Sequence, residues 1–151
     1  MPQLPVNDVM LILERPDGAV CLAERQGTGY ADGQLNLPSG KVEPDEDVFA
    51  AVIREAREEI GIDVERDALR IVHTMYFRNP EGETRVGWFF TATHWSGTPT
   101  NREPHKCAGL SWHLPDHPPH NTVRYNALGI AHYLKGKPFS SHWYDWKDQL
   151  S

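Results

Sequence analysis

The sequence predicts an α/β sandwich that forms one domain, residues 1–151. A chain of 151 residues has the usual size of a single domain and is long enough to bury a sizeable core. Hydrophobic residues make up 39% of it and charged residues 24%, as in an ordinary globular protein. Strand-like runs and helix-like segments are mixed along the chain, and this order is typical of the α/β class.

Residues 6–13 and 19–25 are expected to be the first two strands. Both are largely apolar runs, and the turn sequence RPDG at residues 15–18 separates them. We therefore expect them to pair as a hairpin. Residues 26–46 are rich in Gly, Pro, Asp and Asn and predict a long irregular loop, which in a compact domain is often functional.

A helix is predicted over residues 45–60. Pro44 and Asp45 suit its start, and Gly61 suits its end. Apolar residues recur at helical spacing and predict a buried stripe that consists of Val48, Phe49, Val52, Ile53, Ala56 and Ile60.

The second half of the chain predicts a second hairpin, one more strand and a second helix. The hairpin has strands at 69–78 and 84–94 around the turn sequence NPEG. Residues 110–114 are a short strand candidate, and residues 122–135 predict a helix that stops at a glycine. The tail then has enough apolar surface to pack against the domain, at Phe139, Trp143, Tyr144 and Trp146.

Charge and cysteine content exclude several classes of protein. The net charge of −6 argues against general affinity for nucleic-acid polymers or anionic membranes, although a bound cation can still attract a phosphorylated substrate. Two cysteines, Cys21 and Cys107, are too few for a disulfide framework and fit a reducing compartment. The amino terminus shows neither a signal-peptide pattern nor a membrane span, so we expect a cytoplasmic protein.

The most informative residues are three glutamates in the first helix. Glu55, Glu58 and Glu59 lie at i, i+3 and i+4, so their carboxylates project from one face. Such crowding is unfavourable unless positive charge lies among them; Arg54 can pair with Glu58, and a hard divalent cation can bind the rest. The same pattern is also typical of an ordinary solvated helix face. The glycine-rich loop before the helix favours the first interpretation, because such loops and helix amino termini attract phosphates.

The segment from Gly40 to Ile62 resembles the Nudix box. The family pattern has glycine, five residues, glutamate, seven residues and then R-E-U-x-E-E-x-G-U, with U aliphatic; here Gly40, Glu46 and residues 54–62 match every fixed position. Ala56 is a slightly small occupant of its aliphatic position. The resemblance implies an α/β/α sandwich with a mixed β-sheet and a Mg²⁺-dependent hydrolase, with Mn²⁺ as a possible substitute.

The resemblance also implies roles for individual residues. Glu58 and Glu59 are the expected principal metal ligands, and Glu58 is also counted among the catalytic residues. Glu55 is expected to bind metal or to orient and deprotonate the attacking water, while Arg54 holds the glutamates in place by ion pairing.

Three further positions are implied less directly by the family pattern. Glu46 is expected to support the loop–helix geometry, and the backbone carbonyl of Ser39 to contribute a metal ligand. Family members commonly have Gly-Gly where this chain has Ser39-Gly40, a change that a carbonyl ligand tolerates. Glu103 is the nearest acid to a region where many relatives place another metal ligand.

Three hypotheses for function remain open at this point. The first is a MutT-like enzyme that converts ordinary or oxidised (deoxy)nucleoside triphosphates to monophosphate and pyrophosphate through attack by metal-activated water. The second is a pyrophosphatase for ADP-ribose, a nucleotide sugar or a dinucleotide. The third is a non-catalytic nucleotide sensor, which the intact glutamates disfavour. In each case the ligand is a small nucleotide, and the protein is a monomer or a homodimer.

Candidate nucleotide-binding residues lie in the loop and beside it. Asn36 matches the position at which MutT-like members carry a base-reading asparagine, although asparagine also stabilises turns. Tyr30 and Trp112 can stack on a base, and Arg25, Arg78 and Arg85 can meet phosphates, but each also has a purely structural interpretation.

A histidine-rich stretch in the second half of the chain suggests zinc as an alternative metal. Several potential ligands follow one another at His105, Cys107, His113, His117 and His120, but their spacing fits none of the paired patterns of structural zinc sites. We therefore do not expect zinc in that stretch.

Overall fold

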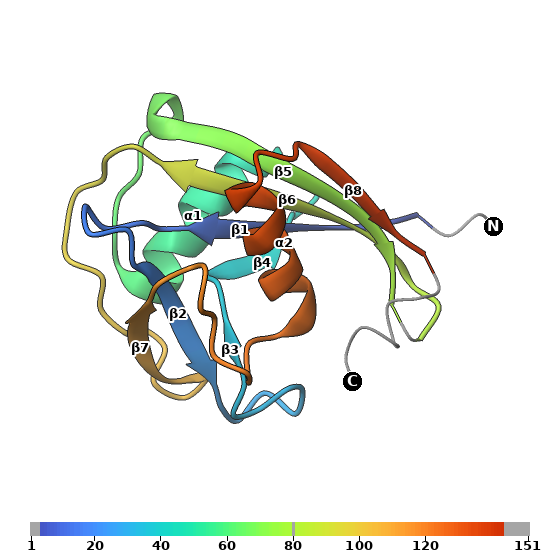
Figure 1. The fold of residues 1–151 in the computed structure, drawn as a ribbon. Helices are drawn as coiled ribbons and strands as arrows, with labels where there is room; N and C mark the ends of the chain where they lie inside the picture. Colours follow the sequence, from blue (N-terminus) through green and yellow to red (C-terminus); the bar gives the residue numbers. More distant parts are fainter. Residues whose placement is uncertain (1–3, 80, 144–151) are drawn as a thin grey trace.

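The centre of the protein is a five-stranded mixed β-sheet (Figure 1). The computed structural model describes residues 4–79 and 81–143. In sheet order, the strands are β4 (Ser39–Lys41), β1 (Val6–Ile12), β6 (Thr84–Ala92), β5 (Leu69–Arg78) and β8 (Phe139–His142). β1 runs parallel to β6 and β8 runs parallel to β5, whereas the β4–β1 and β6–β5 pairs are antiparallel.

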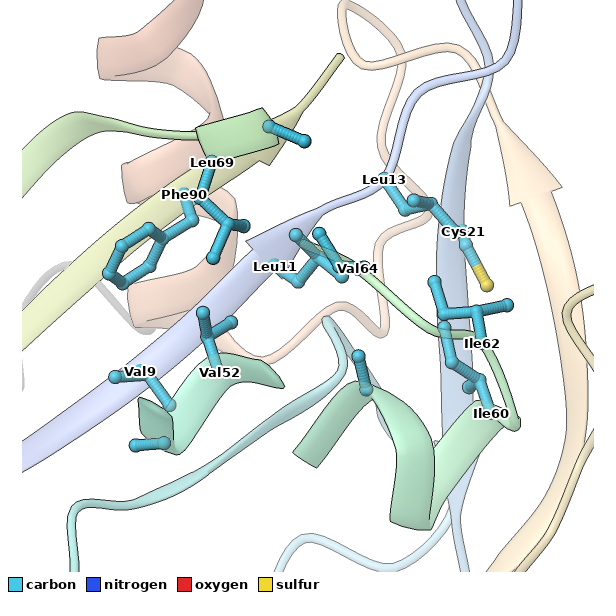
Figure 2. Close-up of a cluster of buried hydrophobic side chains, with 13 residues drawn as sticks. Val9, Leu11, Leu13, Cys21, Val52, Ile60, Ile62, Val64, Leu69 and Phe90 are labelled. Carbon is cyan, nitrogen blue, oxygen red and sulfur yellow. The ribbon is translucent and has the colours of Figure 1, made fainter. Parts of the chain in front are cut away.

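Helices cover opposite faces of this sheet. The α1 helix (Val48–Ile60) packs on the face to which Val9 and Leu11 of β1 point, and Figure 2 shows that cluster with Val52 and Ile60. The α2 helix (Arg124–Leu134) packs on the other face, where Met10 and Ile12 belong to the cluster that contains Ile130. The alternation of side chains along β1 thus supplies both hydrophobic layers. The predicted α/β/α sandwich with a mixed sheet is confirmed.

The expected first hairpin is wrong in its pairing. A second, three-stranded sheet contains β3 (Leu35–Asn36), β2 (Val20–Arg25) and β7 (Cys107–His113), so β1 and β2 belong to different sheets. In the described residues the two runs pair at the tip, through the Glu14–Val20 bridge and the hydrogen bonds from Arg15 N to the Ala19 carbonyl at 2.9 Å and from Cys21 N to the Leu13 carbonyl at 3.1 Å. β1 cannot pair with β2 along its length, because its two edges are already paired with β4 and β6.

The boundaries of α1 follow from its caps. Asp47 is the N-cap, and its carboxylate accepts a hydrogen bond from Ala50 N at 2.9 Å, so the helix begins a few residues later than the predicted residue 45. Gly61 ends it with a left-handed φ of 70°, as the sequence predicts.

Other elements depart from prediction where strands are short or lack periodicity. The loop 26–46 contains β3 and β4, and β7 begins three residues before the expected 110. A short 3₁₀ helix, η1 (Arg66–Ala68), precedes β5, and β8 was not expected as a strand.

The second hairpin and the second helix agree with the prediction. The second hairpin is confirmed by the pairing of β5 with β6, and its turn residue Pro80 lies outside the described residues. The helix predicted over 122–135 is α2, which begins two residues later and ends one residue earlier.

The tail packs against β5 as far as it is described. Phe139 is the first residue of β8, and the ring of Trp143 stacks on Tyr76 at a centroid distance of 5.8 Å. The tail residues Tyr144 and Trp146 lie outside the described residues. Among the described residues, no helix has both the length and the apolar character needed to cross a bilayer.

The contact between α2 and the sheet depends on Gly129. A Cβ at this position would lie 2.1 Å from Cζ of Phe89, whose side chain is fully buried in β6. A buried ring in a close-packed core has little room to move, so the glycine sets how closely the helix approaches.

Replacing Gly129 with alanine is therefore expected to destabilise the protein, although alanine favours helix by about 1 kcal/mol. Overpacking should lower the free energy of unfolding by about 1–3 kcal/mol, measured by urea denaturation. Gly109→Ala is the matched control, because no atom lies within 4 Å of the added Cβ. Unchanged or increased stability of Gly129→Ala would contradict this account of the contact.

Candidate active site

The site is built where β4 passes beside α1. β4 is held in place by antiparallel pairing with β1, in which Gly40 lies opposite Val9. A Cβ on Gly40 would lie 2.1 Å from Oε1 of Glu55, so only a residue without a side chain lets the strand approach so closely. The helix therefore presents its carboxylates directly to the backbone of β4.

Arg54 is the centre of the ion-pair network of the site. Its Nη2 lies 2.6 Å from Glu46 Oε1, and its Nη1 lies 2.7 Å from Glu55 Oε1 and 3.3 Å from Glu58 Oε2. Nη2 also donates to the Lys41 carbonyl at 3.1 Å, which ties α1 to β4. One guanidinium with several donors can hold three carboxylates at once, whereas an ammonium ion offers only a compact point charge.

Glu59 is the most deeply buried acid of the helix. Its Oε2 accepts a hydrogen bond from Ser39 N at 3.0 Å. Burial raises the pKa of Glu59 well above its usual value, and the charge of Glu55 raises it further. Burial also raises the pKa of Glu55, against hydrogen bonds from Arg54 and Glu59 that lower it. The two carboxyl groups thus lie close enough for each to affect the pKa of the other.

The donor set fits a hard divalent cation. Within residues 4–79 and 81–143, no group of three His, Cys, Asp or Glu side chains lies around one point. The third glutamate of the helix, Glu58, is half-exposed and contacts Arg54. Glu55 and Glu59, however, supply carboxylate oxygens in a partly buried place where a positive charge would be favourable. Oxygen donors of this kind suit Mg²⁺ or Mn²⁺.

Glu103 is brought to the end of α1 by the segment that precedes β7. Arg102 N donates to the Glu59 carbonyl at 3.0 Å, and Thr100 N donates to the Ile60 carbonyl at 2.9 Å. The charge of Glu103 is one of the causes that raise the pKa of Glu59. The structure thus places this sequence-predicted acid on the same side of the helix end as the buried pair.

The three residues expected to bind the nucleotide lie together beside β2. Arg25 Nε donates to the Tyr30 carbonyl at 2.8 Å, and the guanidinium carbon lies 5.4 Å from the centre of the Tyr30 ring. Asn36 lies opposite Ala23 in the β2–β3 pair. With its amide oriented to donate to the Ala23 carbonyl at 3.1 Å, its oxygen accepts from Arg25 Nη1 at 3.1 Å.

A cleft of about 1210 Å³ connects this group to β4. Arg25 and Tyr30 line one part of it, and the strand Ser39–Lys41 lines another. The first residues of α2, Arg124 and Tyr125, form part of the opposite wall. One continuous surface thus reaches from Arg25 and Tyr30 to the strand that contacts Glu55 and Glu59, whereas Asn36 lies outside the cleft lining.

Sequence reasoning missed a buried ion pair in this cleft. Arg85 binds Asp8 through two hydrogen bonds of 2.7 and 2.8 Å and also contacts Glu83. Only 4% of Asp8 is exposed, so the charge would be unfavourable without this partner. In the sequence, the only sign of this ion pair is that Asp8 interrupts an apolar strand. Its partner Arg85 is identified by the pairing of β1 with β6.

Two other aromatic and basic candidates lie outside the cleft lining. Trp112 packs under Arg15, whose guanidinium carbon is 4.6 Å from the ring centre. Arg78 donates to the Gly82 carbonyl at 3.2 Å and lies over the Trp143 ring. These contacts agree with the structural interpretation of both residues.

A family model described as the NUDIX domain matches residues 4–132. The chain belongs to the NUDIX family. The members of this family are hydrolases that act on small nucleotide substrates and in general depend on divalent metal, and this chain is therefore a Nudix hydrolase.

Two relatives from Escherichia coli K12 share part of the sequence. A CTP pyrophosphohydrolase is 46% identical over 58 residues, which are 38% of this chain and 42% of the relative. An 8-oxo-dGTP diphosphatase is 26% identical over 92 residues, 61% of this chain and 69% of the relative. The match thus spans less than half the length of the first relative.

Solved structures of Nudix proteins share the fold. A MutT NUDIX hydrolase from Burkholderia pseudomallei superposes with a TM-score of 0.76 at 28% identity, covering 85% of this chain and 98% of the other. The E. coli ORF135 protein superposes with a TM-score of 0.70 at 26% identity, covering 86% and 89%.

Replacing Gly40 with alanine is expected to impair catalysis more than stability. The atoms that its Cβ would meet belong to the flexible Glu55 side chain, which would turn away rather than disrupt the core. A displacement of about 1 Å at a reacting group costs roughly 100-fold in kcat/KM. Nucleotide hydrolysis with Mg²⁺ and the melting temperature are measured together, with Gly109→Ala as the control. Wild-type kcat/KM in Gly40→Ala would show that this contact does not position Glu55.

Proposed function

We propose that this Nudix hydrolase cleaves ordinary or oxidised (deoxy)nucleoside triphosphates to monophosphate and pyrophosphate with Mg²⁺, for which Mn²⁺ can substitute. The observation that carries the proposal is the continuous cleft from Arg25 and Tyr30 to the β4 strand beside the α1 carboxylates. Its two parts suit the two parts of a nucleotide, a base and a charged phosphate chain.

In this proposal, Glu55, Glu58 and Glu59 hold the metal with the Ser39 carbonyl, and Glu103 contributes from the facing segment. The metal supplies charge neutralisation of the phosphates and a lower pKa for a coordinated water. To bind the metal with the other ligands, the Glu58 side chain must move away from Arg54. Because this side chain is half-exposed, it has room to do so.

The residues of the chain then have distinct roles. Glu55 orients the attacking water and accepts its proton, since its carboxylate lies against Gly40 of β4, and Gly40 lines the cleft. Arg54 keeps that carboxylate in place and supplies positive charge between Glu46 and Glu55. No covalent intermediate with the protein is required.

The nucleotide end of the cleft offers stacking and hydrogen bonding. Tyr30 is 64% exposed and its ring can offer a face to a base, Arg25 supplies a cation beside it, and Asn36 contacts Arg25 from outside the cleft lining. The names of the two E. coli relatives both refer to nucleoside triphosphates, CTP and 8-oxo-dGTP, which supports this substrate class.

A substrate panel with Mg²⁺ tests the proposal directly. Nucleoside triphosphates, 8-oxo-dGTP, ADP-ribose and nucleotide sugars are incubated with the enzyme, and monophosphate and pyrophosphate are quantified. Triphosphates are expected to give equal amounts of monophosphate and pyrophosphate, with no reaction in EDTA. Selective cleavage of ADP-ribose or nucleotide sugars would replace the proposed substrate class, and binding without any cleavage would favour the sensor hypothesis.

Substituting Glu55 with glutamine is expected to lower kcat by at least about 100-fold, because the amide cannot accept the proton of the attacking water. Glu65→Gln is the matched control, since Glu65 is exposed beside η1 and lies outside the cleft lining. Circular dichroism and melting temperature establish that both variants fold. Near-normal turnover in Glu55→Gln would remove this residue from the mechanism.

A further inference from the structure

An arginine between two acids lines the cleft and has no part in the proposed reaction. Arg85 of β6 binds Asp8 side-on, through Nε at 2.8 Å and Nη2 at 2.7 Å, and its Nη1 contacts Glu83. All three residues line the cleft. Only 16% of the Arg85 side chain is exposed, so these contacts hold the guanidinium in one orientation.

The guanidinium of Arg85 keeps two N–H groups for a ligand. Arginine has five N–H groups in a fixed plane. Asp8 and Glu83 accept from three of them, so one on Nη1 and one on Nη2 remain without a partner among the described residues. Neighbouring donors of this kind form a fork that pairs with two adjacent acceptors. Because Arg85 lines the cleft, this fork is what it offers to a ligand there.

The charge of Arg85 is already matched by its two carboxylate partners. The group of three has no net positive charge, so it gives a phosphate chain no electrostatic attraction. The sequence makes Arg85 a candidate phosphate contact, but its partners favour a neutral ligand group. A nucleobase is such a group, and its edge carries hydrogen-bond acceptors.

Tyr125 connects this part of the cleft to the exposed Tyr30 ring. Burial raises the pKa of Tyr125, and Asp8, Arg85 and Tyr30 are among the groups whose charges also act on that pKa. Charge effects fall off with distance, so Arg85 and Tyr30 both lie near Tyr125. All three residues line the cleft, and a base at the Tyr30 end can therefore present its edge to Arg85.

Only some bases have two acceptors side by side. Guanine has O6 and N7, the pair to which arginine commonly binds in DNA, and cytosine has O2 and N3. Adenine and uracil have no such pair, because in them a donor group or a C–H stands between the acceptors. We propose that Arg85, oriented by Asp8, selects guanine and cytosine nucleotides over adenine and uracil nucleotides. This inference rests on the proposed function, since it places a nucleotide in the cleft.

Binding of α,β-methylene triphosphates of the four bases tests this selection without requiring hydrolysis. Calorimetry with Mg²⁺ should show that wild type binds the guanine and cytosine analogues at least about fivefold more tightly than the other two. Arg85→Lys keeps the charge but loses the fork, so its four dissociation constants should agree within about twofold. Arg70→Lys, at an exposed arginine of β5 outside the cleft lining, is the matched control and should keep the wild-type ratio. Melting temperatures establish that both variants fold.

A guanine analogue changed at one atom tests the contact even if Arg85→Lys is unstable. The 7-deazaguanine analogue lacks the N7 acceptor, so wild type should bind it at least about fivefold more weakly than the guanine analogue.

Three results would overturn the inference. They are equal binding of the four bases or of guanine and 7-deazaguanine by wild type, unchanged selectivity in Arg85→Lys, and equal weakening of all four analogues in that variant, which would indicate a phosphate contact. Selective binding without hydrolysis of any triphosphate would contradict the proposed function alone, whereas no binding of any analogue would contradict both.

Discussion

The close contact between β4 and α1 is the constraint on which the rest of the site depends. It requires a residue without a side chain at Gly40, pairing of β4 with β1, and packing of α1 on the same strand. The hydrophobic core therefore determines where the carboxylates lie. Arg54 then joins α1 to β4 by donating to the Lys41 carbonyl. The polar contacts therefore add to a separation between α1 and β4 that apolar packing already sets.

The site concentrates negative charge at a cost to the folded state. Arg54 neutralises part of it by contacting Glu46 and Glu55, yet Glu59 lies partly buried beside Glu55, and both the burial and the neighbouring charge raise its pKa. A well-packed apolar helix face would be more favourable, since buried acids are unfavourable unless paired. The proposed function would account for this arrangement, because a cation that binds phosphates needs oxygen ligands in a partly water-excluded place. The family membership of the chain agrees with that explanation.

Local features of the chain were predictable and long-range pairing was not. The spacing of apolar residues and Gly61 predicted α1, its end and the shared face of its three glutamates, since helix geometry is set within a few residues. The pairing of β1 was mispredicted because strand partners depend on which edges remain free in the whole fold. Asp8 and Arg85 likewise met only through the parallel β1–β6 pair, and β3 and β4 are too short to show any periodicity.

The parallel pairing of β1 with β6 also has a consequence for how the chain reaches its native state. Val6 pairs with Arg85, so the second edge of β1 can be paired only after more than half of the polypeptide has been synthesised. Until then, α1 has only an incomplete surface on which to bury its apolar stripe. Contacts so distant in sequence close large loops and slow the approach to the native state. A nascent chain on the ribosome would therefore carry the glutamate-rich helix long before that helix had a stable place to dock.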